Sequence, residues 1–146
     1  MWRRLKNIFH SFRTYADLSP DISTRRRVNQ FLRTRPALSA NEWFEQFWRS
    51  KAISKQVTDF IYLYMQKHTG LEFARVQPHD RLSEDLQIPA VCWFDWEIYF
   101  CRDFNERFAK DLSDHFDPHA LSTIDDLVVF LNQQLLSANH FLKGDG

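Results

Sequence analysis

Apolar residues recur every three or four positions along most of the chain, which is the period of amphipathic helices. The first stripe lies within residues 2–16. Its apolar face holds Trp2, Leu5, Phe9, Phe12 and Ala16. Its other faces hold the basic residues Arg3, Arg4, Lys6, His10 and Arg13. The pattern predicts a basic amphipathic helix that ends near Pro20, because the residue before a proline disfavours helical backbone.

Two shorter helices are expected next, on either side of a linker. The first spans about residues 23–33, and its apolar residues are Val28, Phe31 and Leu32. Residues 33–39 follow as the linker, because Pro36 disfavours helix before it. Ser39 and Glu42 then have the spacing of a capping box, in which each side chain bonds the backbone of the other residue. The helix after this box carries Trp43, Phe44, Phe47 and Trp48.

A longer helix is expected between Ser54, a capping residue type, and Gly70, which suits the left-handed conformation after a helix. Its inward face holds Val57, Phe60, Ile61, Tyr64 and Met65. A long connection over residues 71–88 follows, with a turn expected around residues 78–80.

The stretch PAVCWFDWEIYF, residues 89–100, carries five aromatic rings in twelve residues. Pro89 suits a first helical turn, so we expect one helix from there to Phe108. One apolar stripe holds Val91, Phe94, Ile98, Cys101, Asn105 and Phe108, and the opposite one holds Trp93, Trp96, Phe100 and Phe104. A helix with two apolar sides is central or covered by another segment. We expect the N-terminal helices to cover Phe100 and Phe104, and a partner to contact Trp93 and Trp96.

A final helix is expected to begin after Ser122 or Thr123, because Asp125 and Asp126 favour the positive end of a helix dipole. Its inward residues are Ile124, Leu127, Val128, Leu131 and Leu135. The chain has only three glycines, and the tight turns of an all-β domain need more. These elements predict an all-α fold with a basic amphipathic helical extension over residues 1–38 and a helical domain over residues 39–140.

The zero net charge hides an asymmetry. Residues 1–50 carry ten Lys or Arg and four Asp or Glu, whereas residues 56–146 carry seven and fifteen. A basic front and an acidic back indicate two partners of opposite charge, or one half that folds onto the other.

Several protein classes are disfavoured by composition. No apolar run approaches the roughly 18 residues of a membrane span, and the N-terminus lacks the apolar core of a secretory signal. Cys92 and Cys101 have no His pair at ligand spacing, so we expect reduced thiols rather than a disulfide framework or a zinc site. A cytoplasmic protein is expected, with association at a membrane surface as the alternative.

The chain offers no clear catalytic constellation. Asp95 and Glu97 are two residues apart, so on a helix they point about 200° away from each other and cannot act as a joined acid–base pair. His115 and His119 have helical spacing for a metal, but Pro118 between them favours a loop. Neither a glycine-rich phosphate loop nor a Gly-x-Ser-x-Gly motif is present. We therefore expect no enzyme activity, no cofactor and no metal.

An ordered series of motifs over about residues 54–136 resembles the acyl carrier protein family. The series consists of a helix ending at Gly70, Glu84-Asp85-Leu86 in a long loop, Phe108 and then Asp111-Leu112 after the next helix, and residues 122–131, STIDDLVVFL. More narrowly, the chain looks like a bacterial group of acyl-carrier-like proteins of unknown function. The resemblance implies a small helical bundle that docks on partner proteins through its acidic second helix.

The chain departs from that family at its functional residue. Carrier proteins attach phosphopantetheine to a Ser at the start of the second helix, and here no Ser occurs between Ser83 and Ser113. The favoured hypothesis is therefore a non-catalytic, acyl-carrier-like protein-interaction module without a phosphopantetheine arm. Its expected partner-facing residues are Trp93, Asp95, Trp96 and Glu97.

Two other hypotheses stay open. A peripheral membrane protein would use residues 2–16 as an interfacial helix, inserting the rings of Trp2, Phe9 and Phe12. An inhibitor or immunity-type protein would block a basic partner through the acidic half of the chain. Binding of nucleic acid through Arg25-Arg26-Arg27 ranks lower, because no DNA-binding motif accompanies the triplet.

Overall fold

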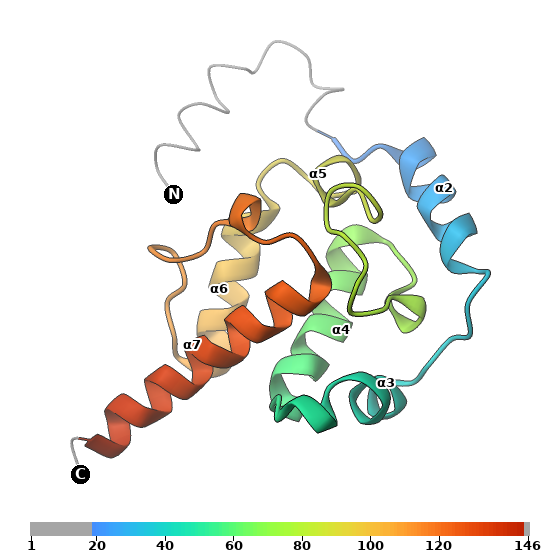
Figure 1. Ribbon diagram of the computed structural model, residues 1–146. Helices are drawn as coiled ribbons and strands as arrows, with labels where there is room; N and C mark the ends of the chain where they lie inside the picture. Colours follow the sequence, from blue (N-terminus) through green and yellow to red (C-terminus); the bar gives the residue numbers. More distant parts are fainter. Residues whose placement is uncertain (1–18, 145–146) are drawn as a thin grey trace.

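The computed structural model describes residues 19–144, and the side chains of residues 19–137. Within this range the chain is helical, which confirms the all-α class, and its only β-type pairing is an isolated bridge between Arg81 and Thr123. The α-helices are α2 (Ile22–Leu32), α3 (Ala40–Phe47), α4 (Lys55–Thr69), α5 (Ile88–Val91), α6 (Trp96–Phe108) and α7 (Ile124–Gly144) (Figure 1). Three short 3₁₀ turns join them: η2 (Arg49–Lys51), η3 (Phe73–Arg75) and η4 (Pro118–Ala120). The helix predicted over residues 2–16 lies outside the described residues.

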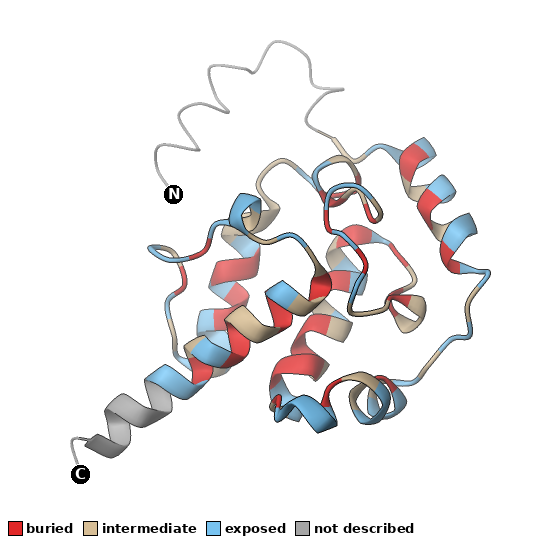
Figure 2. Cartoon of the chain, viewed as in Figure 1, coloured by how far each residue is buried: buried red, intermediate tan, exposed pale blue. Residues whose placement is uncertain are grey.

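The core forms around α4, which contacts α3, η3 and α7. Buried residues run along α4, α6 and α7 (Figure 2). On α4, the ring of Phe60 packs edge-on against two rings of α6, with centroids 5.6 Å from Phe100 and 5.5 Å from Phe104. Phe100 also stacks on Phe116, at 5.1 Å. The rings of Phe100 and Phe104 are therefore covered by α4 and by the segment before α7.

The predicted helix ends are largely confirmed. Ser39 and Glu42 form both hydrogen bonds of a capping box. Gly70 has a φ of 69°, the left-handed conformation expected of it. The Thr123 hydroxyl accepts from the Asp126 N–H at 3.2 Å, so Thr123 caps α7. Ser54 precedes α4 as predicted, but its side chain makes no capping bond, and its N–H instead donates to the side-chain oxygen of Asn132 on α7, at 3.0 Å.

Helix α2 is fastened to the rest of the described chain by polar contacts as well as by buried Val28 and Leu32. The Arg25 guanidinium donates to the Val91 carbonyl at 2.8 Å. The Asn29 side chain donates to the Gly70 carbonyl at 3.0 Å and accepts from the Glu72 N–H at 2.9 Å. These contacts cross the predicted boundary at residue 38, which stays a prediction.

The continuous helix predicted from Pro89 to Phe108 is wrong. Helix α5 ends at Val91, the backbone is extended at Cys92, and α6 starts at Trp96. Pro89 does lie in the first turn of α5, as predicted. The helix breaks here because α5 and α6 pack against different parts of the protein. The interruption lets Val91 and Cys92 enter the core while α6 turns its own rings toward α4.

Candidate functional site: an aromatic linker between two pockets

The linker between α5 and α6, residues 92–95, places an exposed tryptophan beside two pockets. The Cys92 side chain points inward and is 2% exposed, whereas Trp93 is 47% exposed. Extended backbone alternates the direction of successive side chains, so this segment buries one residue and presents the next. A continuous helix would have given a different arrangement.

The structure brings all four predicted partner-facing residues into this linker and the first turn of α6. Trp93 and Trp96 each line two pockets. Asp95 lines one of these pockets and Glu97 lines the other. The prediction that the two carboxylates do not act as a joint acid–base pair stays a prediction.

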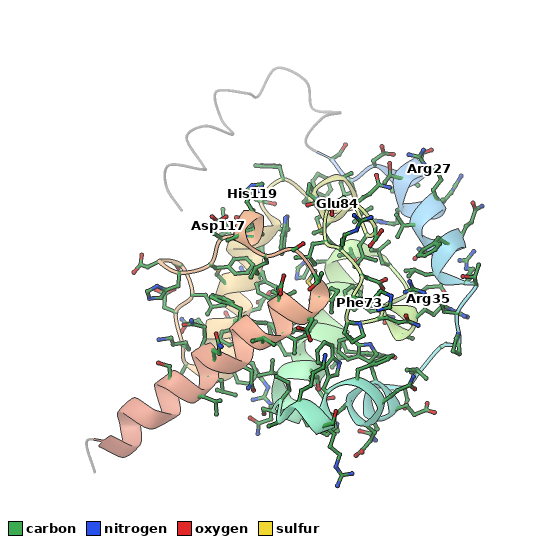
Figure 3. The ribbon with its side chains drawn as sticks, in the orientation of Figure 1. Arg27, Arg35, Phe73, Glu84, Asp117 and His119 are labelled. Atoms are coloured by element: carbon green, nitrogen blue, oxygen red, sulfur yellow. The ribbon has the colours of Figure 1, made fainter. Side chains whose placement is uncertain are left out.

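The smaller space, which we call the inner pocket, has a volume of about 170 Å³. Its apolar walls include Met65, Leu82, Ile88, Trp96, Phe116 and Leu127. Its polar residues are Ser83, Glu97 and His119. His119 lies on η4, close to the start of α6 (Figure 3). Apolar cavities of about 150 Å³ accept a benzene-sized group, so the inner pocket has room for one apolar side chain.

The wider space, which we call the outer pocket, has a volume of about 510 Å³. Its lining consists of His68, Trp93, Phe94, Asp95, Trp96 and Tyr99. Sequence reasoning missed the contributions of His68, Phe94 and Tyr99. Tyr99 had a usable signal, because it follows Trp96 by three residues and so shares its side of a helix. His68 had none, because it comes from the last turn of α4.

His68 carries an unusual environment at the edge of the outer pocket. Its ring lies 5.0 Å from the ring of Tyr64, and its Nε2 atom lies 3.7 Å from the Asp103 carboxylate. Among the described residues this buried nitrogen has no hydrogen-bond partner. Burial lowers the pKa of His68 and outweighs the opposing pull of Asp103. The imidazole is therefore mainly neutral at neutral pH.

The same cluster holds Tyr64 in its protonated form. Burial raises the pKa of Tyr64 to about 12, and the nearby Asp103 carboxylate acts in the same direction. Asp103 is itself buried, and its other side faces the Arg102 guanidinium at 3.6 Å. The Asp103 carboxylate is thus the one negative charge of this cluster, and the Arg102 guanidinium, also on α6, balances it.

The cysteine in the linker is not poised for chemistry. Burial raises the pKa of the Cys92 thiol to about 12. Because the thiolate is the reactive form, such a thiol is a poor nucleophile at neutral pH. Cys92 and Cys101 are both buried, and no disulfide bond joins them in the structure; the expectation of reduced thiols stays a prediction.

The remaining candidate residues do not gather into a site. His115 and His119 are both exposed, on a turn and on η4, as expected from Pro118. Over residues 19–137, whose side chains are described, no group of three His, Cys, Asp or Glu side chains is placed to hold a metal ion. Over residues 19–144 no helix has the length and apolar character needed to cross a membrane. The predicted N-terminal binding residues lie outside the described residues: Trp2, Arg3, Arg4, Lys6, Phe9, Phe12 and Arg13.

A comparison of the chain with protein-family models, with curated proteins and with solved structures finds no match in any of the three.

Proposed function

We propose that the chain is a non-catalytic, acyl-carrier-like interaction module that binds a protein partner through the linker and the inner pocket. The observation that carries the proposal is an exposed tryptophan, Trp93, beside an apolar pocket of about 170 Å³. Binding energy at protein interfaces is concentrated in a few anchors that fill such pockets, and tryptophan is enriched among them.

The order of the elements supports the carrier-like part of the proposal. A helix, a long loop, a second helix, a short segment and a last helix follow one another as α4, residues 71–87, α5 with α6, η4 and α7. In the carrier family the start of the second helix holds the modified Ser. Here that region contains Cys92, Trp93, Phe94 and Asp95, none of which is a Ser, and the thiol of Cys92 is buried.

The proposed partner presents one apolar side chain with basic residues beside it. The apolar group would enter the inner pocket, and the basic residues would face Glu97 and the acidic residues that dominate the chain after residue 56. Charge complementarity of this kind guides association and excludes wrong partners more than it adds affinity.

The proposal is tested by affinity capture with the full chain, followed by mass spectrometry. Two variants probe the site: Trp93→Ala removes the exposed ring, and Ser83→Arg places a bulky cation at the pocket. Leu63→Ala is the matched control, because Leu63 is a 65% exposed apolar residue that lines neither pocket. A partner captured by the native chain and the control, but lost with both site variants, supports the proposal. A partner retained equally by all four proteins contradicts it.

The absence of the arm has its own test. The full chain is incubated with a phosphopantetheinyl transferase and coenzyme A, and its intact mass is measured. No change in mass is expected, because no Ser occurs between Ser83 and Ser113. A gain equal to one phosphopantetheine group would show a carrier and overturn the non-carrier part of the proposal.

A further inference from the structure

The outer pocket has a different chemistry from the inner pocket. Five of its six lining residues carry aromatic rings, and the sixth, Asp95, carries a carboxylate. Aromatic faces attract cations through their negative quadrupole, and cages of such rings recognise quaternary ammonium groups. We propose that the outer pocket binds a small-molecule quaternary ammonium compound through cation–π contacts with Trp93, Trp96 and Tyr99, assisted by the Asp95 carboxylate.

The formal charge of the outer pocket favours a cation. Its lining contains no Lys or Arg. Within residues 19–137 no side chain forms a hydrogen bond or an ion pair with the carboxylate of Asp95. The one titratable base in the lining of the outer pocket is His68. Burial keeps His68 mainly neutral, so it does not repel a positive ligand. The pocket thus presents one negative charge and several electron-rich rings.

One of these rings also contacts a cation that does not line the outer pocket. The Arg102 guanidinium carbon lies 4.8 Å from the ring centroid of Tyr99, within the distance of a cation–π contact, and the charge of Arg102 is offset by the Asp103 carboxylate at 3.6 Å. Two aromatic contacts hold the ring of Trp96 in place: its centroid lies 5.9 Å from that of Phe100 and 6.1 Å from that of Phe116. A braced ring loses little side-chain entropy when a ligand binds.

The same features select a methylated ammonium over a primary one. A quaternary ammonium has no N–H donor, so it gains little from water and much from ring faces. A primary ammonium is strongly hydrated and needs several acceptors to replace that water. The outer pocket supplies one carboxylate among rings, which suits the quaternary group. Its volume of about 510 Å³ lies in the range typical of small-molecule sites.

This inference does not depend on the proposed function, because the ligand is a small molecule and need not belong to a protein, although Trp93, Phe94 and Trp96 line both pockets. The probe is choline, titrated into the full chain by calorimetry at constant ionic strength. The control ligand is 3,3-dimethylbutanol, which has the shape of choline but carbon in place of the charged nitrogen. Saturable binding of choline, at least about fivefold tighter than that of the neutral isostere, is expected. Equal binding of the two ligands, or no binding of choline, overturns the proposal.

Variants locate the binding on the protein. Trp93→Leu and Tyr99→Leu remove one ring each and are expected to weaken choline binding at least about threefold. Both residues are well exposed, at 47% and 40%, so either substitution leaves the core intact. Asp95→Asn is expected to weaken binding of choline but not of the isostere. Leu63→Ala is the control, with unchanged binding. Choline binding that survives all three pocket variants unchanged places the site elsewhere and refutes the proposal.

Discussion

Arg35 and Asp80 form a largely buried ion pair with two parallel hydrogen bonds, at 2.6 and 2.8 Å; the Asp80 side chain is 2% exposed and that of Arg35 is 15% exposed. Arg35 lies in the linker after α2, and Asp80 lies in the long loop before α5. The Asp80 carboxylate also accepts a hydrogen bond from the Gln77 N–H at 2.7 Å. The backbone carbonyl of Asp80 accepts one from the Ile124 N–H at 3.0 Å. One residue therefore joins the N-terminal linker, the loop and the first turn of α7.

Substitution of Arg35 by Met is expected to lower the free energy of unfolding by about 3 kcal/mol, because it leaves the carboxylate of Asp80 buried without its cation. Arg33→Met is the matched control, since Arg33 pairs with Glu72 at the surface, with side chains 62% and 33% exposed. That control is expected to lose less than about 1 kcal/mol. Urea unfolding followed by circular dichroism measures both, and equal losses would contradict the prediction.

The C-terminal ends of α4 and α6 predict opposite changes in stability when glycine is removed from one and introduced at the other. Gly70 after α4 and Ala109 after α6 both have left-handed backbone, with φ of 69° and 54°. A side chain in this conformation costs about 1 kcal/mol. A Cβ at position 70 would also lie 2.6 Å from Nε of Arg25. Gly70→Ala is therefore expected to lower stability by about 1–2 kcal/mol, and Ala109→Gly to raise it by about 0.5–1 kcal/mol. Thermal unfolding of the two variants checks the signs, and a shift in the same direction for both would be incompatible with this account.

The parts of the fold that could be predicted from sequence are those set by local rules. The capping box at Ser39, the end of α4 at Gly70 and the buried face of α7 each depend on residues within a few positions of one another. The broken helix at Cys92 could not be predicted in this way. Both apolar stripes of residues 91–108 fit helical spacing. The position of the break depends on how these side chains pack against α4 and the rest of the core, which are distant in sequence.

The candidate site follows the same division. Trp93, Asp95, Trp96 and Glu97 could be selected because an aromatic and acidic cluster stands out in the sequence. The division of these residues between two pockets could not be predicted, because His68 and Phe116, which also line the pockets, come from distant segments of the chain. The pairing of Arg35 with Asp80 is likewise a tertiary contact, across 45 residues.

His68 is expected to titrate below the ordinary range of histidine. Burial disfavours its charged form more strongly than Asp103, 3.7 Å away, favours it. The unfolded chain then binds a proton before the folded chain does as the pH falls. The contribution of His68 to stability is thus complete above its unfolded pKa of about 6.5 and is lost as the pH falls through the folded pKa. NMR titration of the His68 imidazole measures the midpoint, and a value above that of an unfolded peptide would show that Asp103 dominates.

Cys92 predicts a loss of stability in alkaline solution. Burial raises the pKa of its thiol to about 12, whereas an unfolded thiol ionises near 8.5. The unfolded chain therefore releases this proton first, so the contribution of the thiol is complete below the unfolded pKa and is lost as the pH rises toward the folded one. The loss is at most about 1.4 kcal/mol per pH unit. Tyr64 adds to it at higher pH, since its pKa is also raised to about 12.

The comparison that isolates Cys92 uses Cys92→Val, which keeps an apolar group of similar size and cannot ionise. Urea unfolding between about pH 8 and 10 is expected to show a steeper decline for the native chain than for the variant, because Tyr64 is common to both. Reaction of the native thiols with a disulfide reagent is expected to be slow until urea exposes them, since Cys92 and Cys101 are 2% and 3% exposed. Parallel pH profiles for the two proteins, together with fast reaction of both thiols in the folded chain, would mean that the linker does not bury Cys92, and would contradict this prediction.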